Sequence, residues 1–176
     1  TFEVGDLRQW TPPEPVDVLV SNATLQWLPD HLDLLPSLVG HVRPGGWFAV
    51  QVPGNHDQPS HIIRHDLATD PAYATYVAGV ARPQAHDAQT YLRALTALGC
   101  TVDAWETTYL HRLHGKDPVF DWVRGTGARP ALEALPSALR EEFTQEFRHR
   151  LRAAYPPGPD GAVILPFRRI FVVATI

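Results

Sequence analysis

Polar side chains stand directly after an apolar run near the start of the chain. Ser21 and Asn22 follow Val16–Val20, a short and mostly β-branched stretch that is typical of a strand buried in a parallel sheet. Ligands of open α/β sheets bind at the carboxyl ends of the strands. The sequence therefore predicts that Ser21 and Asn22 lie at a ligand-binding edge. An ordinary strand end followed by a turn is the alternative interpretation.

Arginines near the end of the chain could bind an anion. Arg129 follows the Gly-rich segment 125–127, and Arg168 and Arg169 interrupt an apolar stretch. A guanidinium group makes planar, bidentate contacts with carboxylates and phosphates. Neighbouring residues of a strand face opposite sides, so at most one of Arg168 and Arg169 points into a common pocket. For Arg129, an exposed loop position is the alternative.

Other kinds of chemistry have little support. His111, His114 and Asp117 are close in sequence, but they fall at an expected strand end and in a loop, so we predict no metal site. The sequence has no P-loop, no GxSxG and no CxxC motif. We also predict no catalytic side chain that acts as a nucleophile or a base.

Hydrophobic periodicity predicts an α/β fold with a mostly parallel sheet and helices on both faces. Strands are expected at 1–4, 16–20, 47–52, 101–110 and 165–176. Helices are expected at 31–42, at 61–80 with a break near 70–71, at 87–98, after 117–118 and at 137–155. Asp30 is the expected N-cap of the first helix, and Tyr91, Leu92, Leu95 and Leu98 are expected to face the core.

Length and composition predict one globular domain over all 176 residues. The formal net charge of −4 gives no electrostatic reason to expect nucleic acid binding, and no apolar run is long enough for a membrane helix. Cys100 is the only cysteine, which fits a reducing cytoplasm. The chain has no methionine and opens on strand-like residues, so we expect that an N-terminal part is missing.

Several motifs together carry a resemblance to a known family. They are SNATLQWLPDH at 21–31, PGGWFAVQVPGN at 44–55, ALGCTVDAWETTYLH at 97–111, DWVRGTGARPAL at 121–132 and PFRRIFVVA at 166–174. The chain resembles the class I S-adenosylmethionine-dependent methyltransferases and, within them, the trans-aconitate 2-methyltransferases. The resemblance implies a Rossmann-like fold whose first strands and Gly-rich cofactor loop, roughly 60 or more residues, are not in the chain.

The resemblance also implies which residues contact S-adenosylmethionine. Asp6 takes the position whose carboxylate faces the adenine amino group, and Leu7 lies beside the ring. Asn22 and the backbone of Ala23 take the position at the methionine end of the cofactor. Trp27 is expected to pack beside the methionine moiety.

The remaining implied positions concern the substrate. Gln51 ends its strand close to where a substrate must enter, and the helical segment 116–155 would be an insertion that covers the substrate. Tyr109 and His111 are expected to orient the substrate, with core or surface filling as the alternative. The full set of implied substrate-binding residues is Gln51, Tyr109, His111, Arg129 and Arg168, with Arg169 in place of Arg168 as the other option.

The implied reaction transfers a methyl group from S-adenosylmethionine to one carboxylate of trans-aconitate. A carboxylate with a pKa near ~4 is already ionised at neutral pH, so the reaction needs no general base. The expected partner is a small polycarboxylate. Two alternatives stay open: a methyltransferase for another small carboxylic acid such as a malonyl thioester, and a non-catalytic binding protein on the same fold.

Overall fold

The computed structural model describes residues 2–80 and 82–176, which divide into two compact units. Unit 1 consists of Thr1–Gly54, Gln84–Thr107 and Arg169–Ile176. Unit 2 consists of Asn55–Pro83 and Thr108–Arg168. The segment 116–155, expected to be an inserted cover, lies wholly in unit 2.

Unit 1 is built on a sheet with the strand order β1-β2-β4-β3. The strands are β1 (Val16–Asn22), β2 (Val42–Pro53), β3 (Thr101–Leu113) and β4 (Val163–Thr175), and the last two contribute residues to both units. β1 runs parallel to β2, whereas β4 runs antiparallel to β2. The sequence pattern predicted the strands, but it carried no signal for the direction of β4 or for its place between β2 and β3.

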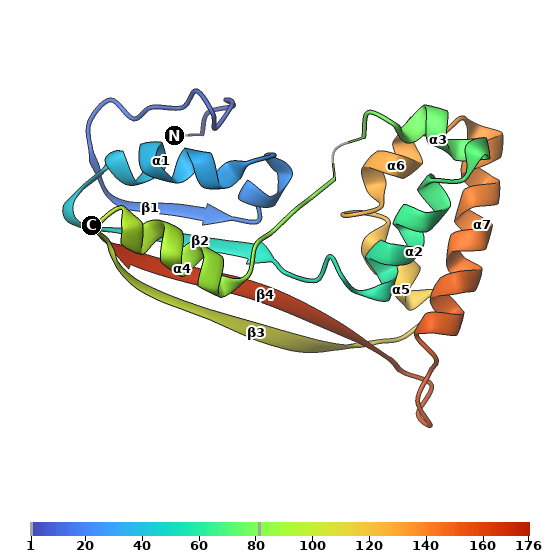
Figure 1. Ribbon diagram of the computed structural model, residues 1–176. Coiled ribbons are helices and arrows are strands. Elements are labelled where there is room, and N and C mark those ends of the chain that lie inside the picture. Colours follow the sequence, from blue (N-terminus) through green and yellow to red (C-terminus); the bar gives the residue numbers. More distant parts are fainter. Residues whose placement is uncertain (1, 81) are drawn as a thin grey trace. The chain divides into compact units, whose positions relative to one another are not determined.

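One face of this sheet carries the core of unit 1. Phe48, Val50 and Val52 alternate along β2 and are buried with side chains of β4, as the two-residue period of a strand requires. The helices α1 (Leu35–Gly40) and α4 (Ala88–Ala97) pack on this cluster and lie along the sheet in Figure 1.

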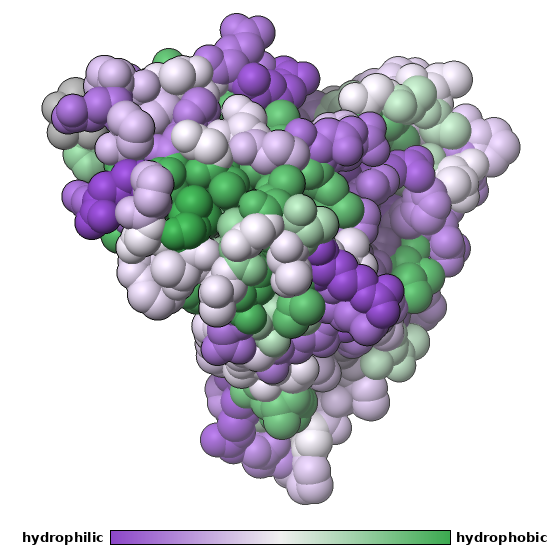
Figure 2. Space-filling model, turned by 60° about the vertical axis from the view of Figure 1, so that its left-hand side comes forward, coloured by the Kyte–Doolittle hydropathy of each residue, from purple (hydrophilic) through white to green (hydrophobic). Residues whose placement is uncertain are grey.

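The opposite face of the sheet is open. Val18, Val20 and Trp47 point to it and are 53%, 67% and 48% exposed. Helices were expected on both faces, but the helices of unit 1 that the structure describes cover one. Hydrophobic residues also gather on the molecular surface, where Figure 2 shows green patches bordered by purple ones.

Four local predictions in unit 1 were wrong. The described part of the expected first strand, Phe2–Val4, has no regular structure, because no described strand lies beyond β1 to pair with it, while Thr1 is outside the described residues. Asp30 does not cap a helix: its φ is 55°, its side chain makes no capping hydrogen bond, and a 3-10 turn, η2 (His31–Leu34), follows it. Leu92 and Leu98 are 37% and 40% exposed. Tyr91 and Leu95 are the buried residues of α4, and they face the core together because residues four apart share one side of a helix.

Unit 2 is a group of helices, visible in Figure 1 as α2, α3, α5, α6 and α7. They span Pro59–Ala68, Pro71–Val77, Pro118–Val123, Arg129–Ala134 and Ser137–Ala154. The helix predicted at 137–155 is confirmed as α7, and Phe143, Phe147 and Leu151 recur every four residues along its buried side. The predicted break at 70–71 is also confirmed, since the Asp70 side chain accepts a hydrogen bond from the Ala72 amide and so caps α3. No helix among the described residues combines the length and the apolar character that crossing a bilayer demands.

Candidate functional site

The end of β1 forms a constrained bend beside β2. Asn22 lies opposite Gln51 in the parallel register, and the Ala23 amide donates a hydrogen bond to the Gln51 carbonyl at 2.9 Å. Ala23 has a φ of 53°, a left-handed conformation that costs a residue with a Cβ roughly 1–2 kcal/mol. Backbone strain of this kind collects at ligand-binding sites, where the surrounding structure holds it in place.

Hydrogen bonds from the next turn keep this bend in shape. The Gln26 side-chain amide donates to the Ala23 carbonyl at 2.7 Å, and the Gln26 carbonyl accepts from the Gln84 amide at 2.7 Å. Gln26 and Trp27 belong to the 3-10 turn η1 (Leu25–Trp27), which begins directly after Thr24. Trp27 is half-buried in this turn. The bend therefore presents Asn22, which is exposed, on a rigid support.

A buried histidine anchors the far end of the same loop. His31 Nδ1 lies 3.1 Å from the Leu28 carbonyl, which can only accept, so Nδ1 carries the proton. His31 Nε2 then accepts from the Tyr91 hydroxyl at 2.7 Å. Burial lowers the pKa of His31 and raises that of Tyr91 to about 12, so this pair stays neutral and structural.

Asp6 lies in a turn that is closed by hydrogen bonds from Arg8. The Asp6 carboxylate accepts from Arg8 Nε at 2.9 Å, from Arg8 Nη2 at 2.5 Å and from the Arg8 amide at 3.0 Å. These hydrogen bonds lower the pKa of Asp6 to about 2, so its carboxylate is ionised at neutral pH. Leu7 packs against the core cluster of unit 1, which fixes where the turn sits in that unit.

Of the two adjacent arginines, Arg169 is the one that reaches Gln51. Arg169 Nη1 donates to Gln51 Oε1 at 2.8 Å, and Gln51 is buried on the open side of β2. Arg168, the residue named in the predicted substrate set, belongs to unit 2, where its guanidinium lies 3.6 Å from the carboxylate of Asp57. The two arginines thus face different partners, as the alternation along a strand predicted.

Tyr109 and His111 share one side of β3 in unit 2. Their rings stack at 6.3 Å, and His111 also lies 4.5 Å from the ring of Trp122 and 5.9 Å from that of Phe167. His111 Nε2 is buried and has no hydrogen-bond partner among the described residues. A buried polar nitrogen without a partner is costly, so this atom is suited to a group that the chain itself does not supply.

Arg129 begins α6 (Arg129–Ala134), directly after the turn that contains the Gly-rich segment 125–127. Its Nε donates to Glu133 Oε1 at 2.7 Å one helical turn later, and its side chain is 64% exposed. The ion pair raises the pKa of Arg129, which stays charged. An exposed pair of this type contributes little to stability, so Arg129 can exchange Glu133 for a ligand at small cost.

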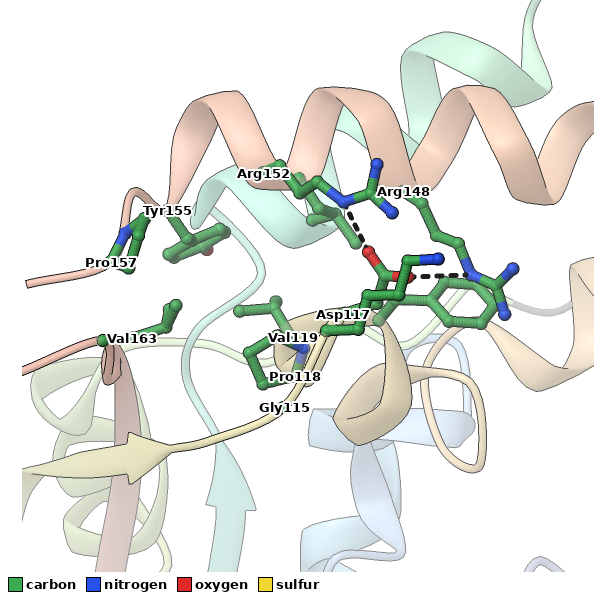
Figure 3. A pocket seen from close by; sticks show the side chains of 13 residues that line it. Gly115, Asp117, Pro118, Val119, Arg148, Arg152, Tyr155, Pro157 and Val163 are labelled. Carbon is green, nitrogen blue, oxygen red and sulfur yellow. Dashed lines mark hydrogen bonds and ion pairs between the residues drawn. The ribbon is translucent and has the colours of Figure 1, made fainter.

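A separate pocket of about 300 Å³ lies within unit 2, and none of the sequence-predicted site residues lines it. Figure 3 shows Arg148 and Arg152 pointing from α7 toward the carboxylate of Asp117. Arg152 Nε lies 2.6 Å and Arg148 Nε 3.8 Å from the Asp117 oxygens, and the Asp117 side chain is 10% exposed. Because both cations meet a carboxylate of the chain, we regard this cluster as part of the scaffold.

His61 and Arg64 of α2 are absent from the set of site residues predicted from the sequence. They lie three residues apart near the start of a helix, a spacing that puts them on one side, but the sequence held no sign of what they pack against. In the structure they lie against Gly127, more than sixty positions along the chain.

Comparison with solved structures defines the class of the fold. A protein from Bacillus halodurans assigned as a methyltransferase matches 97% of this chain and 68% of its own, with a TM-score of 0.51 and 10% identity. The YcgJ protein from Bacillus subtilis matches 97% and 68%, with a TM-score of 0.51 and 11% identity. At these identities the likeness shows the fold alone, and it confirms the predicted Rossmann-like α/β class.

Curated relatives are much closer in sequence, although no protein-family model matches the chain. The trans-aconitate 2-methyltransferase of Streptomyces avermitilis is 51% identical over 98% of this chain and 65% of its own length. Those of Streptomyces coelicolor and Mycolicibacterium gilvum are 52% and 48% identical over 98% of this chain, and the matches cover 58% and 69% of their lengths. The chain belongs to the trans-aconitate 2-methyltransferase family, and it spans about 58–69% of the length of these relatives.

Proposed function

We propose that the protein carrying this chain methylates one carboxylate of trans-aconitate, with S-adenosylmethionine as the methyl donor. A carboxylate oxygen forms a bond to the methyl carbon while the bond between that carbon and the sulfonium sulfur breaks. The products are a methyl ester and S-adenosylhomocysteine, and no proton needs to be moved. The observation that carries the proposal is the 45–52% identity to relatives of that name over nearly the whole chain.

Unit 1 has groups that suit the methyl donor. S-adenosylmethionine supplies, when bound, a methyl group made electrophilic by a positively charged sulfur. The exposed Asn22 and the strained peptide at Ala23 would hold its methionine end, with Trp27 close by in the same loop. Asp6 is an ionised acceptor that would take the adenine amino group, with Leu7 beside the ring.

The chain's own work in this reaction is binding and alignment. An ionised carboxylate is already a nucleophile, so the absence of a predicted general base agrees with the chemistry. Holding oxygen, carbon and sulfur in line and excluding water can contribute several kcal/mol. We assign this role for the substrate to Gln51, Tyr109, His111, Arg129 and Arg168, with the segment 116–155 as the proposed cover, and we add Arg169 because it contacts Gln51.

A test of the reaction needs a panel of acids and a labelled methyl donor. The protein is incubated with methyl-labelled S-adenosylmethionine and, separately, with trans-aconitate, cis-aconitate, citrate and a malonyl thioester. We expect the methyl ester of trans-aconitate as the main product by mass spectrometry. If another acid is labelled preferentially, that acid is the substrate in place of trans-aconitate. Cofactor binding without labelling of any acid would support a non-catalytic binding protein.

We also propose that the reaction takes place in the cytoplasm. Cys100 is buried, and burial raises the pKa of its thiol, which keeps the thiol protonated and unreactive. A reduced, buried thiol suits a cytoplasmic enzyme. Fractionation of cells with an antibody against the protein would test this assignment.

A further inference from the structure

A partly buried arginine of unit 2 pairs with no acid among the described residues. Arg64 lies on α2, and its Nη1 donates a hydrogen bond to the Gly127 carbonyl. Arg64 forms no ion pair with any residue that the structure describes, whereas a guanidinium has five N–H donors. Burial and the nearby positive charge of Arg82 both lower the pKa of Arg64. A desolvated cation without a counter-charge is costly to keep, so its retention calls for an explanation.

His61 lies beside Arg64 on the same side of the helix. Gly127 packs against both: a Cβ built on Gly127 would lie 3.2 Å from His61 Cε1 and 3.6 Å from Arg64 Nη1. The His56 ring meets that of His61 edge-on at 5.1 Å. Burial, and then the charges of Arg64 and His56, lower the pKa of His61 to about 4, so His61 is neutral at pH 7. A neutral imidazole still offers one N–H donor.

The carboxylate of Asp57, which acts on His61, pairs with Arg168. Asp57 favours the charged form of His61, but this is the weakest of the influences on that ring. Asp57 is 67% exposed and lies 3.6 Å from the guanidinium of Arg168. Among the described residues, no carboxylate therefore pairs with the positive charge of Arg64 beside His61.

We propose that His61 and Arg64 bind one carboxylate of the substrate. The guanidinium offers its remaining N–H groups as a fork, and His61 adds a further donor from the same side of α2. Gly127 has no side chain, which lets His61 and Arg64 approach the 125–127 segment closely. The assignment rests on the proposed function, since trans-aconitate is the tricarboxylate that it binds.

The first test compares substitutions in the protein carrying this chain. Arg64→Gln removes the charge at similar length. Arg43→Gln is the matched control, because the Arg43 side chain is 53% exposed, pairs with Asp17 and lies outside the proposed binding residues and the proposed cover. Loss of a charged hydrogen-bonding group should raise the KM for trans-aconitate about 10- to 100-fold, with a smaller change in kcat. The affinity of Arg64→Gln for S-adenosylhomocysteine and the kinetic constants of Arg43→Gln should match those of the wild type.

The second test measures binding at the subsite by NMR and does not depend on turnover. In protein with isotopically labelled histidine, saturation with trans-aconitate should raise the pKa of His61 in an NMR titration, because an anion now faces the ring. This rise should disappear in Arg64→Lys, in which a point charge replaces the fork. If Arg64→Gln fails to fold, His61→Gln and Arg64→Lys provide the same comparison of KM.

The outcomes separate the subsite from the reaction. Turnover of trans-aconitate with an unchanged KM in Arg64→Gln and an unmoved His61 would overturn the subsite and leave the proposed function standing. If the wild type does not methylate trans-aconitate, the proposed function fails, and citrate and inorganic phosphate then serve as the anions in the NMR titration. A His61 pKa that none of these anions moves would overturn the subsite as well.

Discussion

Unit 2 contains two groups of arginines that differ in how their charge is balanced. Around the pocket of Figure 3, Arg148 and Arg152 share the carboxylate of Asp117, which is 10% exposed. On α2, Arg64 contacts the Gly127 carbonyl and forms no ion pair with a described residue. In the first group a carboxylate of the chain pairs with both arginines, whereas in the second no described acid pairs with Arg64. The comparison suggests that the first serves stability and the second serves binding.

Removal of the acid from the first group should have the largest effect on stability. Asp117→Asn leaves Arg148 and Arg152 facing each other without a counter-charge, although both are partly exposed. We expect the free energy of unfolding to fall by about 2–3 kcal/mol in urea titrations. Asp121→Asn is the control, because Asp121 is 52% exposed, pairs with Arg124 at 3.5 Å and should cost less than ~1 kcal/mol. Equal effects of the two substitutions would remove the distinction between the groups.

Acid should destabilise the second group. The pKa of His61 is about 4 in the folded protein, against 6.5 for the unperturbed side chain, so the unfolded state takes up the proton first as the pH falls. Stability should therefore fall between pH 6.5 and pH 4 and should lose nothing further from this residue below pH 4. The loss is about 2 kcal/mol once screening of the partly exposed ring is allowed for.

The measurement compares unfolding of the wild type and His61→Gln across this pH range. Arg64, His56 and Asp57 are present in both proteins, so the difference between them reports His61. Parallel pH profiles for the two proteins would contradict the prediction.

Gly127→Ala tests how closely the second group is packed. The new Cβ would lie 3.2 Å from His61 Cε1, which is tighter than ordinary contact, so the ring must shift. We expect a loss of about 1 kcal/mol of stability together with weaker binding of trans-aconitate. Gly125→Ala is the matched control, because a Cβ at Gly125 meets nothing within 4 Å. Similar results for both glycines would show that the contact is unimportant.

The smallest change in stability is expected at Arg64 itself. Arg64→Met removes a desolvated cation and one hydrogen bond, and these effects oppose each other. The free energy of unfolding should stay within about 1 kcal/mol of the wild type or rise, while the KM for trans-aconitate increases. A loss as large as that of Asp117→Asn would assign Arg64 to the scaffold.

Periodicity predicted the elements with a strong local signal. The helix α7 could be predicted because Phe143, Phe147 and Leu151 repeat every four residues. The strand β1 could be predicted because four of the five residues of Val16–Val20 are apolar. The same pattern predicted that the strand ends at Val20, whereas β1 continues to Asn22. The predicted strand at 1–4 was wrong because a strand needs a neighbouring strand. The described residues Phe2–Val4 have a strand-like sequence, but no described strand pairs with them.

Contacts between distant segments could not be predicted from the sequence. The meeting of Arg64 with Gly127, and the choice of Arg169 over Arg168 for Gln51, depend on packing that local patterns do not encode. Arg129 shows the opposite case. An exposed loop position was one of its two interpretations, yet Arg129 begins a helix and pairs with Glu133.

The most direct measurement is the affinity for trans-aconitate by calorimetry, with S-adenosylhomocysteine at saturation, in the wild type and in Arg64→Gln. The account predicts that the wild type binds trans-aconitate and that Arg64→Gln binds it at least about tenfold more weakly, as loss of a charged contact requires. Equal dissociation constants in proteins of equal stability would contradict it.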